Sequence, residues 1–332
     1  MGWQWLSLAS GISDINIDSG IGSKMIKKGL AKYSVRTKAL VSLALVCILW
    51  GTTWIASKEG VKHMPPLQMA GVRQLVAGSL YILFFLSRGI SWPKGREWYA
   101  VGILAFLNIL CSNGLTTWGI KYISAGLGAI IAATFPLWMV VIGLFTSAKR
   151  IAPNALKGFI LGFAGICVIF YEHLHDFFNP DFLFGICISL TAAWTWAFGT
   201  LYTKQQAKSF NPYFSLGLQM FISGIVLTVV SEGSGKTIPI AAIPWQSWAA
   251  IAYLVVLGSV VAFAAYLYAL QHLSVELTSV YAYINPVVAV ILGAILFGEK
   301  LTIFIVAGGA VALYGVYMIN NALKKPAVHL PS

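Results

Sequence analysis

Long apolar segments follow one another along this chain, with short polar connections between them. A helix of about 20 apolar residues crosses the roughly 30 Å hydrocarbon core of a bilayer. Lipid offers no partners to backbone N–H and C=O groups, so such segments cross it as helices. We therefore predict an all-α polytopic membrane protein of ten transmembrane helices, at 39–57, 68–86, 98–120, 125–146, 155–171, 182–202, 213–230, 248–270, 275–297 and 303–320.

The composition supports a membrane protein and excludes the soluble classes. Hydrophobic residues make up 58% of the chain and charged residues 10%, against about 25% charged in ordinary globular proteins. Too few charges are present to cover a soluble surface, which argues against a soluble enzyme, a nucleic-acid binder and a disordered chain. The four cysteines lie within apolar segments without CxxC pairing, so we expect inert thiols rather than disulfides.

The distribution of basic residues predicts the orientation of the chain. Lys and Arg number 22 against 10 Asp and Glu, a net charge of +12. With the N-terminus in the cytoplasm, 16 basic residues fall on the inner side, 5 on the outer side, and Arg73 lies within a span. An excess of Lys and Arg marks cytoplasmic connections. Both termini are therefore predicted to be cytoplasmic.

The two ends of the chain are predicted to be tails. Residues 1–38 end in a basic run, and their first 23 residues lack the basic start and apolar core of a signal peptide. We expect 1–38 to be a largely disordered cytoplasmic tail, with Met25 as a second candidate initiator. Residues 322–332 are expected to form a second cytoplasmic tail.

The second half of the chain repeats the first. At an offset of 146, Trp50 matches Trp196, Lys58 matches Lys204, Pro66 matches Pro212, Gly71 matches Gly217 and Gly78 matches Gly224. The offset then becomes 150. There, Ser124 matches Ser274, Pro136 matches Pro286, Gly143 matches Gly293, Gly158 matches Gly308 and Gly165 matches Gly315. The prediction is one five-helix unit over 39–171 and a second over 182–321.

An odd number of spans in each unit places the two copies in opposite directions across the membrane. Inverted-topology repeats of this kind build secondary transporters, which bind substrate near the midplane where the repeats meet. The repeat therefore predicts a transporter, rather than an enzyme, that works by alternating access.

Several segments resemble a known family. They are LWGTTWIASK in the first span, GIKYISAGLGAIIAATFPLWMVVIGLF in spans three and four, ALQHLSVELTSVYAYINPVVAVILGAILFGEKLT in spans eight and nine, and the closing GGAVALYG. Together they resemble EamA-type members of the drug/metabolite transporter superfamily over residues 39–321. The resemblance implies export of amino acids or related small metabolites. One departure is that Lys149-Arg150 stands where the second unit has Glu299-Lys300, which indicates that the halves are not interchangeable and argues against a catalytic role for Glu299.

Arg73 is the strongest single candidate for substrate binding. A charge within a span costs about 2.5–3.5 kcal/mol on insertion scales and needs a partner or a wet cavity. It could bind a carboxylate or another anionic group, or it could snorkel to the nearer interface. Its repeat counterpart, Gln219, is uncharged. This difference favours a site contacted mainly from one half.

Aromatic and neutral polar side chains complete the predicted central cavity. Each could equally serve as packing or as contact between helices. The predicted substrate-binding residues are Trp50, Arg73, Asn113, Thr117, Trp118, Trp196, Gln219, Tyr266, Tyr283 and Asn285. Pro136 and Pro286 each remove a helical hydrogen bond within a span, so they are predicted to act as kinks with a shared conformational role.

The remaining expectations concern partners and rival functions. We expect a small-molecule substrate, the lipid bilayer of a bacterial inner membrane, no nucleic acid, no cofactor and no metal. The acidic loop around Glu172 and His175 fits a solvated connection better than a metal site, and monomer and homodimer both stay open. The first rival function is a nucleotide-sugar or phosphorylated-sugar exchanger of the same superfamily. The second is a non-transporting membrane enzyme or scaffold.

Coupling to ions is open at this stage. Proton-driven carriers usually carry Asp, Glu or His within their spans, and here Glu276 and Glu299 lie near span ends. Uniport or exchange is therefore as well supported as proton antiport.

Overall fold

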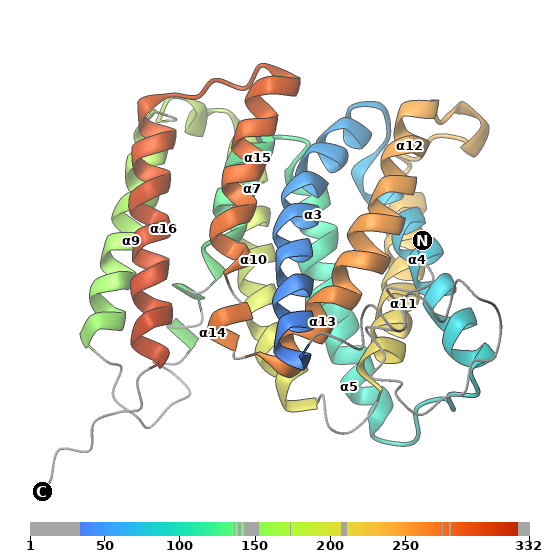
Figure 1. Cartoon of the computed structure of the whole chain (residues 1–332). Helices are drawn as coiled ribbons and strands as arrows, with labels where there is room; N and C mark the ends of the chain where they lie inside the picture. Colours follow the sequence, from blue (N-terminus) through green and yellow to red (C-terminus); the bar gives the residue numbers. More distant parts are fainter. Residues whose placement is uncertain are drawn as a thin grey trace, which may run out of the picture.

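The computed structural model describes residues 34–135, 137–138, 141–142, 153–172, 174–206, 211–273, 275–278 and 280–324. Within these ranges the regular structure is helical (Figure 1). The elements are α3 (Val35–His63), α4 (Pro66–Ser87), α5 (Glu97–Leu104), η1 (Ala105–Gly114), α6 (Leu115–Gly119), α7 (Ala125–Ala132), α9 (Pro153–Glu172), η2 (Asp176–Phe178), α10 (Pro180–Gln206), α11 (Pro212–Gly233), η3 (Ile240–Ala242), α12 (Trp245–Tyr253), η4 (Leu254–Val261), α13 (Ala262–His272), α14 (Val275–Thr278), α15 (Tyr281–Phe297) and α16 (Ile303–Lys324).

The helices confirm a polytopic all-α membrane protein. Six are long and apolar enough to cross a membrane: Val35–His63, Pro66–Ser87, Glu97–Gly119, Pro180–Thr203, Pro212–Gly233 and Trp245–His272. Three shorter apolar helices, Leu156–Tyr171, Tyr281–Phe297 and Ile303–Ile319, correspond to the predicted spans five, nine and ten. The fourth predicted span begins as α7, and Pro136 and most of its second half lie outside the described residues, as do most of the two predicted tails.

Local sequence signals set several helix ends. The Ser34 hydroxyl accepts a hydrogen bond from the Thr37 N–H and caps α3. The repeat-related Pro66 and Pro212 open α4 and α11, where the missing proline N–H leaves no helical bond unmade. Gly298 ends α15 in the left-handed conformation, with φ 65°.

Span two of the first repeat packs along span seven of the second through glycines. A Cβ added at Gly78 of α4 would come within 2.5 Å of the Phe221 backbone nitrogen, and one at Gly224 of α11 within 2.6 Å of the Leu75 backbone nitrogen. These two contacts are repeat copies of each other, because Gly224 follows Gly78 by 146 residues and Phe221 follows Leu75 by the same number. Small residues allow membrane helices to approach this closely.

Spans five and ten pair in the same way. Helices α9 and α16 lie side by side at one edge of the bundle (Figure 1). A Cβ at Gly158 would meet the Gly315 carbonyl oxygen at 2.7 Å, and one at Gly308 would meet the Gly165 carbonyl oxygen at 2.7 Å. Each contact is again the repeat copy of the other, so the two halves meet as an isologous pair within one chain.

Spans three and eight each contain a π-helical segment, η1 and η4. These segments lie at equivalent places in the two repeats, because η1 shifted by 150 residues nearly coincides with η4. A π-helical turn is rare and is frequently found at functional sites. The η1 segment supplies Ser112 and Asn113 to the candidate site, and η4 contacts that site through the hydrogen bond of Ser259 with Arg73.

Candidate substrate-binding site

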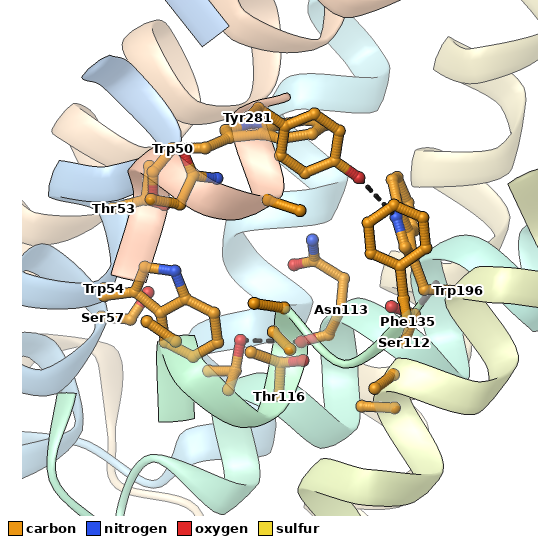
Figure 2. A pocket seen from close by; sticks show the side chains of 18 of the residues that line it. Trp50, Thr53, Trp54, Ser57, Ser112, Asn113, Thr116, Phe135, Trp196 and Tyr281 are labelled. Atoms are coloured by element: carbon orange, nitrogen blue, oxygen red, sulfur yellow. Dashed lines mark hydrogen bonds between the residues drawn. The ribbon is translucent and has the colours of Figure 1, made fainter. Parts of the chain in front are cut away.

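A central cavity lies between helices of both repeats. The volume of this cavity, counted as the space open to the centres of water-sized molecules, is about 130 Å³. By the same measure a single water molecule needs about 10–15 Å³. The side chains that line it come from α3, α4, η1, α6, α7, α10, α13 and α15 (Figure 2). They are Trp50, Thr53, Trp54, Ser57, Arg73, Ser112, Asn113, Thr116, Thr117, Ala129, Ala132, Ala133, Phe135, Ala192, Ala193, Trp196, Phe263, Tyr281, Ala282, Asn285 and Pro286.

Arg73 brings a positive charge to this cavity. It is 5% exposed, and its Nε donates to the Ser259 hydroxyl in η4 at 3.0 Å. Gly258 keeps the space beside it open, since a Cβ there would lie 3.3 Å from an Arg73 terminal nitrogen. No carboxylate among the described residues lies within ion-pair distance of Arg73. The guanidinium can therefore bind an anionic group of a solute, because its fork of donors matches a carboxylate.

Five aromatic rings pack together beside the cavity, and we call them the aromatic wall: Trp50, Trp196, Phe263, Tyr266 and Tyr281. Four of them line the cavity, and the fifth, Tyr266, packs against Trp50. The Trp50 ring centroid lies 5.0 Å from those of Phe263 and Tyr266, 5.1 Å from that of Tyr281 and 5.8 Å from that of Trp196. Edge-to-face pairs of this kind contribute about 0.5–1.5 kcal/mol beyond the area they bury.

Hydrogen bonds hold the aromatic wall in place. Trp196 Nε1 donates to the Tyr281 hydroxyl at 2.9 Å, and Trp50 Nε1 donates to the Gly258 carbonyl at 3.2 Å. The Trp50 bond connects the two repeats, and the Trp196 bond joins α10 with α15 within the second repeat, so the wall contains residues of both halves.

Neutral amides line the cavity beside Arg73. Asn113 accepts a hydrogen bond from Gln74 Nε2 at 3.0 Å. With its amide nitrogen toward the carbonyls of Tyr281 (3.1 Å) and Cys47 (2.8 Å), Asn285 connects α15 with α3. Pro286 has no N–H, so the carbonyl of Ala282, four residues earlier, has no helical partner at this edge of the cavity.

Six of the ten predicted substrate-binding residues line this cavity: Trp50, Arg73, Asn113, Thr117, Trp196 and Asn285. The predicted kink residue Pro286 lines it as well. The other four, Trp118, Gln219, Tyr266 and Tyr283, are not among its lining residues.

Helical geometry explains why Trp118 and Tyr283 lie elsewhere. Trp118 follows Thr117 by one residue, about 100° around the helix, and packs against Phe184 with ring centroids 5.0 Å apart. Tyr283 is two residues from Tyr281, so it faces the opposite side of α15 and packs against Leu137, Val316 and Ile319.

Tyr266 and Gln219 line a second cavity behind the aromatic wall. It leaves about 40 Å³ for the centres of water-sized molecules, and the wall residues Trp196 and Phe263 line both cavities. The lining residues of the second cavity are Glu97, Ala100, Val101, Leu104, Asn108, Trp196, Thr200, Thr203, Pro212, Ser215, Leu216, Gln219, Phe263, Tyr266 and Leu267. The predicted single site is thus divided in two by the wall.

Several lining residues were not among the predicted ones. Thr53, Trp54 and Ser57 follow Trp50 by three, four and seven residues and share its side of α3, a spacing that the first span displays in the sequence. Phe135, which follows the end of α7 by three residues, stacks on Tyr281 of α15 with ring centroids 5.9 Å apart, and this pairing has no local sequence signal.

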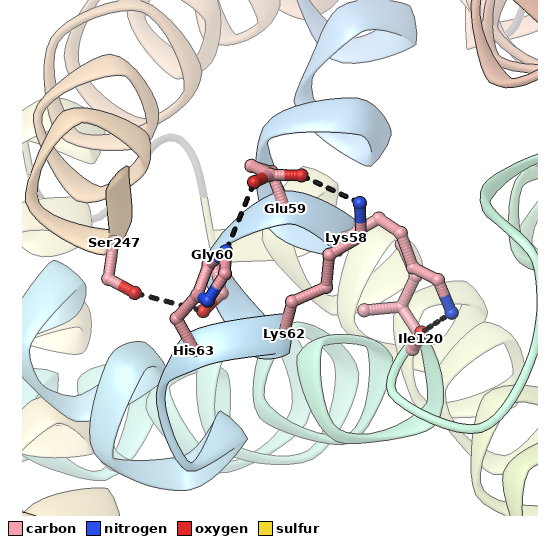
Figure 3. Close-up of polar contacts among 7 residues, drawn as sticks. All are labelled: Lys58, Glu59, Gly60, Lys62, His63, Ile120 and Ser247. Atoms are coloured by element: carbon pink, nitrogen blue, oxygen red, sulfur yellow. Dashed lines mark hydrogen bonds and ion pairs between the residues drawn. The ribbon is translucent and has the colours of Figure 1, made fainter. Parts of the chain in front are cut away.

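One end of the bundle is held by charged side chains at helix ends. The Glu299 carboxylate accepts from the backbone N–H groups of Ala125 at 2.7 Å and Gly126 at 3.1 Å, which caps the positive end of α7. Lys58 Nζ donates to the carbonyl of Ile120 at 2.8 Å (Figure 3). It also donates to the carbonyl of Ile123 at 2.7 Å. Glu299 thus has a structural role here. The equivalent positions Lys149 and Arg150 lie outside the described residues.

The profile of the EamA-like transporter family matches residues 37–171 and 183–321. The chain belongs to the EamA-like transporter family. The uncharacterized inner membrane transporter YedA of Escherichia coli (strain K12) is 33% identical over 265 residues, 79% of this chain and 83% of that protein. The uncharacterized transporter YvbV of Bacillus subtilis (strain 168) is 28% identical over 296 residues, 88% of this chain and 95% of that protein.

A solved crystal structure shares the fold. Its TM-score is 0.63 at 16% sequence identity, and the match covers 88% of this chain and 100% of the other. The family and the relatives together make this protein a membrane transporter.

Proposed function

We propose that this transporter exports amino acids or related small metabolites across a bacterial inner membrane. The observation that carries the proposal is Arg73, a buried guanidinium that faces the central cavity and has no carboxylate partner among the described residues. A solute carboxylate would supply that partner. The aromatic wall and the amides of Asn113 and Asn285 suit a small solute with an apolar side chain.

An exchanger of nucleotide sugars or sugar phosphates is the weaker candidate. A phosphate group carries up to two negative charges and is usually met by more than one Lys or Arg. Of the described side chains that line the central cavity, Arg73 carries the single charge. A monovalent carboxylate matches that charge better than a phosphate does.

The proposed mechanism is alternating access by movement of the two inverted repeats around the cavity. Inverted repeats can exchange their conformations and so produce inward-open and outward-open states of similar energy. The proposed orientation has both termini in the cytoplasm, since 16 basic residues lie on that side against 5 on the other.

Reconstitution into liposomes tests the proposal. Proteoliposomes would be loaded with labelled amino acids, their deaminated acids or sugar phosphates, with and without a pH gradient. We expect flux of at least one amino acid and no flux of sugar phosphates. The control is the same protein with Arg73→Gln, which we expect to lose that flux.

The outcomes separate the candidates. Flux of sugar phosphates alone would replace the amino-acid proposal with the exchanger. Full flux through Arg73→Gln would remove the carboxylate from the proposed mechanism. Flux that follows the pH gradient would indicate proton antiport, whereas flux that ignores it would indicate uniport or exchange.

A further inference from the structure

The π-helical segment η4 of the second repeat bonds to side chains of the first repeat. Trp50 Nε1 donates to the Gly258 carbonyl at 3.2 Å. The Tyr81 hydroxyl of α4 donates to the Val260 carbonyl at 2.9 Å and, at the longer distance of 3.4 Å, to the Ser259 carbonyl. A carbonyl oxygen has two lone pairs, so it can accept from a side chain as well as from the helix backbone. Tyr81 therefore fixes the backbone of η4 at Ser259.

Ser259 and Gly258 cover one edge of the Arg73 guanidinium. Nε donates to the Ser259 hydroxyl at 3.0 Å, and Nη2 lies 3.3 Å from the place that a Cβ on Gly258 would take. The Nε–H and one N–H of Nη2 point to the same edge of the planar group, so η4 occupies that edge. The remaining edge, formed by Nη1 and Nη2, has no hydrogen bond to the residues that the structure describes. A carboxylate in the central cavity can bind that edge with both oxygens.

The repeat copy of this arrangement lacks both the cation and the hydroxyl. Arg73 corresponds to Gln219 at an offset of 146, and Ser259 corresponds to Ile109 of η1 at an offset of 150. Gln219 donates to the Ser215 hydroxyl of its own helix at 3.0 Å, and Ile109 is fully buried. Helix α11 still packs against η1 as α4 packs against η4, so the crossing forms with an apolar side chain at this position. The Ser259 hydroxyl therefore serves the cation rather than the packing of the helices.

We propose that Ser259 is a positioning residue for the transported solute: it accepts from Arg73 Nε and thereby holds the two terminal nitrogens ready for a carboxylate. Tyr81 supports Ser259 by fixing the backbone of η4. The inference rests on the proposed function and deepens it, because it makes the solute bind through both carboxylate oxygens. An amide presents one acceptor oxygen and an NH₂ group that cannot accept, so the positioned guanidinium discriminates an acid from its amide.

The test compares an acid with its neutral amide. 4-Methylpentanoate has two acceptor oxygens, and 4-methylpentanamide has the same carbon chain with one. Isothermal titration calorimetry on the purified full-length protein measures the binding of both, and the readout is the preference for the acid, which is the ratio of the two dissociation constants. A general loss of packing would change the binding of both probes, whereas a guanidinium that has turned changes the ratio.

The variants separate positioning from packing. Ser259→Ala removes the acceptor, and Tyr81→Phe removes the hydroxyl that supports it. Ser223→Ala is the matched control, because Ser223 is 1% exposed and donates to the Ala105 carbonyl of η1 at 2.9 Å. That variant also loses a buried serine hydrogen bond between a π-helical segment and the other repeat, but Ser223 lines neither cavity. Gly102→Ala is the neutral control, since a Cβ at Gly102 meets nothing within 4 Å.

We expect Ser259→Ala to lower the preference for the acid about tenfold, because it removes a hydrogen bond to a charged group. Tyr81→Phe should lower the preference about threefold, while Ser223→Ala and Gly102→Ala should keep it within about twofold of the wild type. An unchanged preference in Ser259→Ala, or an equal loss in Ser223→Ala, would overturn the inference. If Ser259→Ala does not fold, an unchanged preference in Tyr81→Phe overturns it in the same way.

The outcomes for this inference and for the proposed function are distinguishable. An unchanged preference in Ser259→Ala leaves the proposed function standing if amino-acid flux persists in liposomes. Wild-type protein that binds the acid no more tightly than the amide overturns the inference alone, again if that flux persists. Absence of amino-acid flux in the wild type would overturn both.

Discussion

Seven repeat-equivalent positions line the central cavity in the first repeat and the second cavity in the second repeat, yet the two cavities differ in size and in charge. The central cavity leaves about 130 Å³ and contains Arg73, while the second leaves about 40 Å³ and contains Gln219 at the matching position. The backbone pattern is therefore duplicated and the chemistry is not. The aromatic wall thus separates a cavity with a cation from one with a neutral amide at the matching position.

The largest effect is expected from removing the partition between the two cavities. Trp196 lines both, contacts Trp50 at 5.8 Å and donates to Tyr281. Trp196 is partly buried, so Trp196→Ala should lower the free energy of unfolding by about 3 kcal/mol, the lower end for tryptophan truncations, measured by denaturation in detergent. Trp194→Ala on the same helix is the control, since Trp194 is 43% exposed. Equal losses in the two variants would show that the wall does not stabilise the bundle.

Arg73→Gln places in the central cavity the residue type that Gln219 supplies at the matching position of the second cavity. We expect binding of 4-methylpentanoate to weaken by about 30-fold, because losing one partner of a buried charged pair costs about 2 kcal/mol or more. Isothermal titration calorimetry would measure it. Arg73→Lys should fall between the wild type and Arg73→Gln, since lysine keeps the charge and loses the fork of donors. Unchanged acid binding in Arg73→Gln would mean that the guanidinium is structural.

Gly258→Ala tests whether open space beside Arg73 matters. The new Cβ would lie 2.9 Å from Thr53 Cγ2 and 3.3 Å from an Arg73 terminal nitrogen. We expect the guanidinium to shift and acid binding to weaken about tenfold, which corresponds to 1.4 kcal/mol. The same substitution at Gly102 should have no effect. A Gly258→Ala protein that binds the acid as the wild type does would show that the guanidinium tolerates the displacement.

The smallest effect concerns the end of the bundle that Glu299 holds. Glu299→Gln removes a charge from the positive end of α7, and we expect a loss of about 1 kcal/mol in the free energy of unfolding. Thermal denaturation measures it. Glu59→Gln is the control, because Glu59 forms partly exposed ion pairs with Lys62 and His63 on α3 (Figure 3), which contribute about 0.5 kcal/mol or less. A larger loss in Glu59→Gln would reverse this assignment.

Much of the fold could be predicted from the sequence because lipid restricts the alternatives. Apolar length gives the spans, and the matches of Gly78 with Gly224 and of Gly158 with Gly308 give the inverted repeat. Those glycines turned out to lie where the halves touch. The sequence therefore contained the position of the main interfaces as well as the number of helices.

The site was less accessible to prediction for two physical reasons. Which face of a helix meets the cavity depends on rotation about its axis, and an error of one or two residues exchanges Thr117 with Trp118 or Tyr281 with Tyr283. The division by the aromatic wall depends on contacts between distant segments, such as Trp50 with Tyr266. No periodicity within one span reports such contacts.

The glycine contacts between the halves have a consequence for covalent continuity. Because the contact of Gly78 with Phe221 recurs as that of Gly224 with Leu75, the interface is the one that two separate polypeptides of opposite topology would form. The connection between α9 and α10 would then serve mainly to raise the effective concentration of one half near the other. We therefore expect the two halves, expressed as separate chains cut between residues 174 and 179, to find each other in the bilayer and rebuild the bundle.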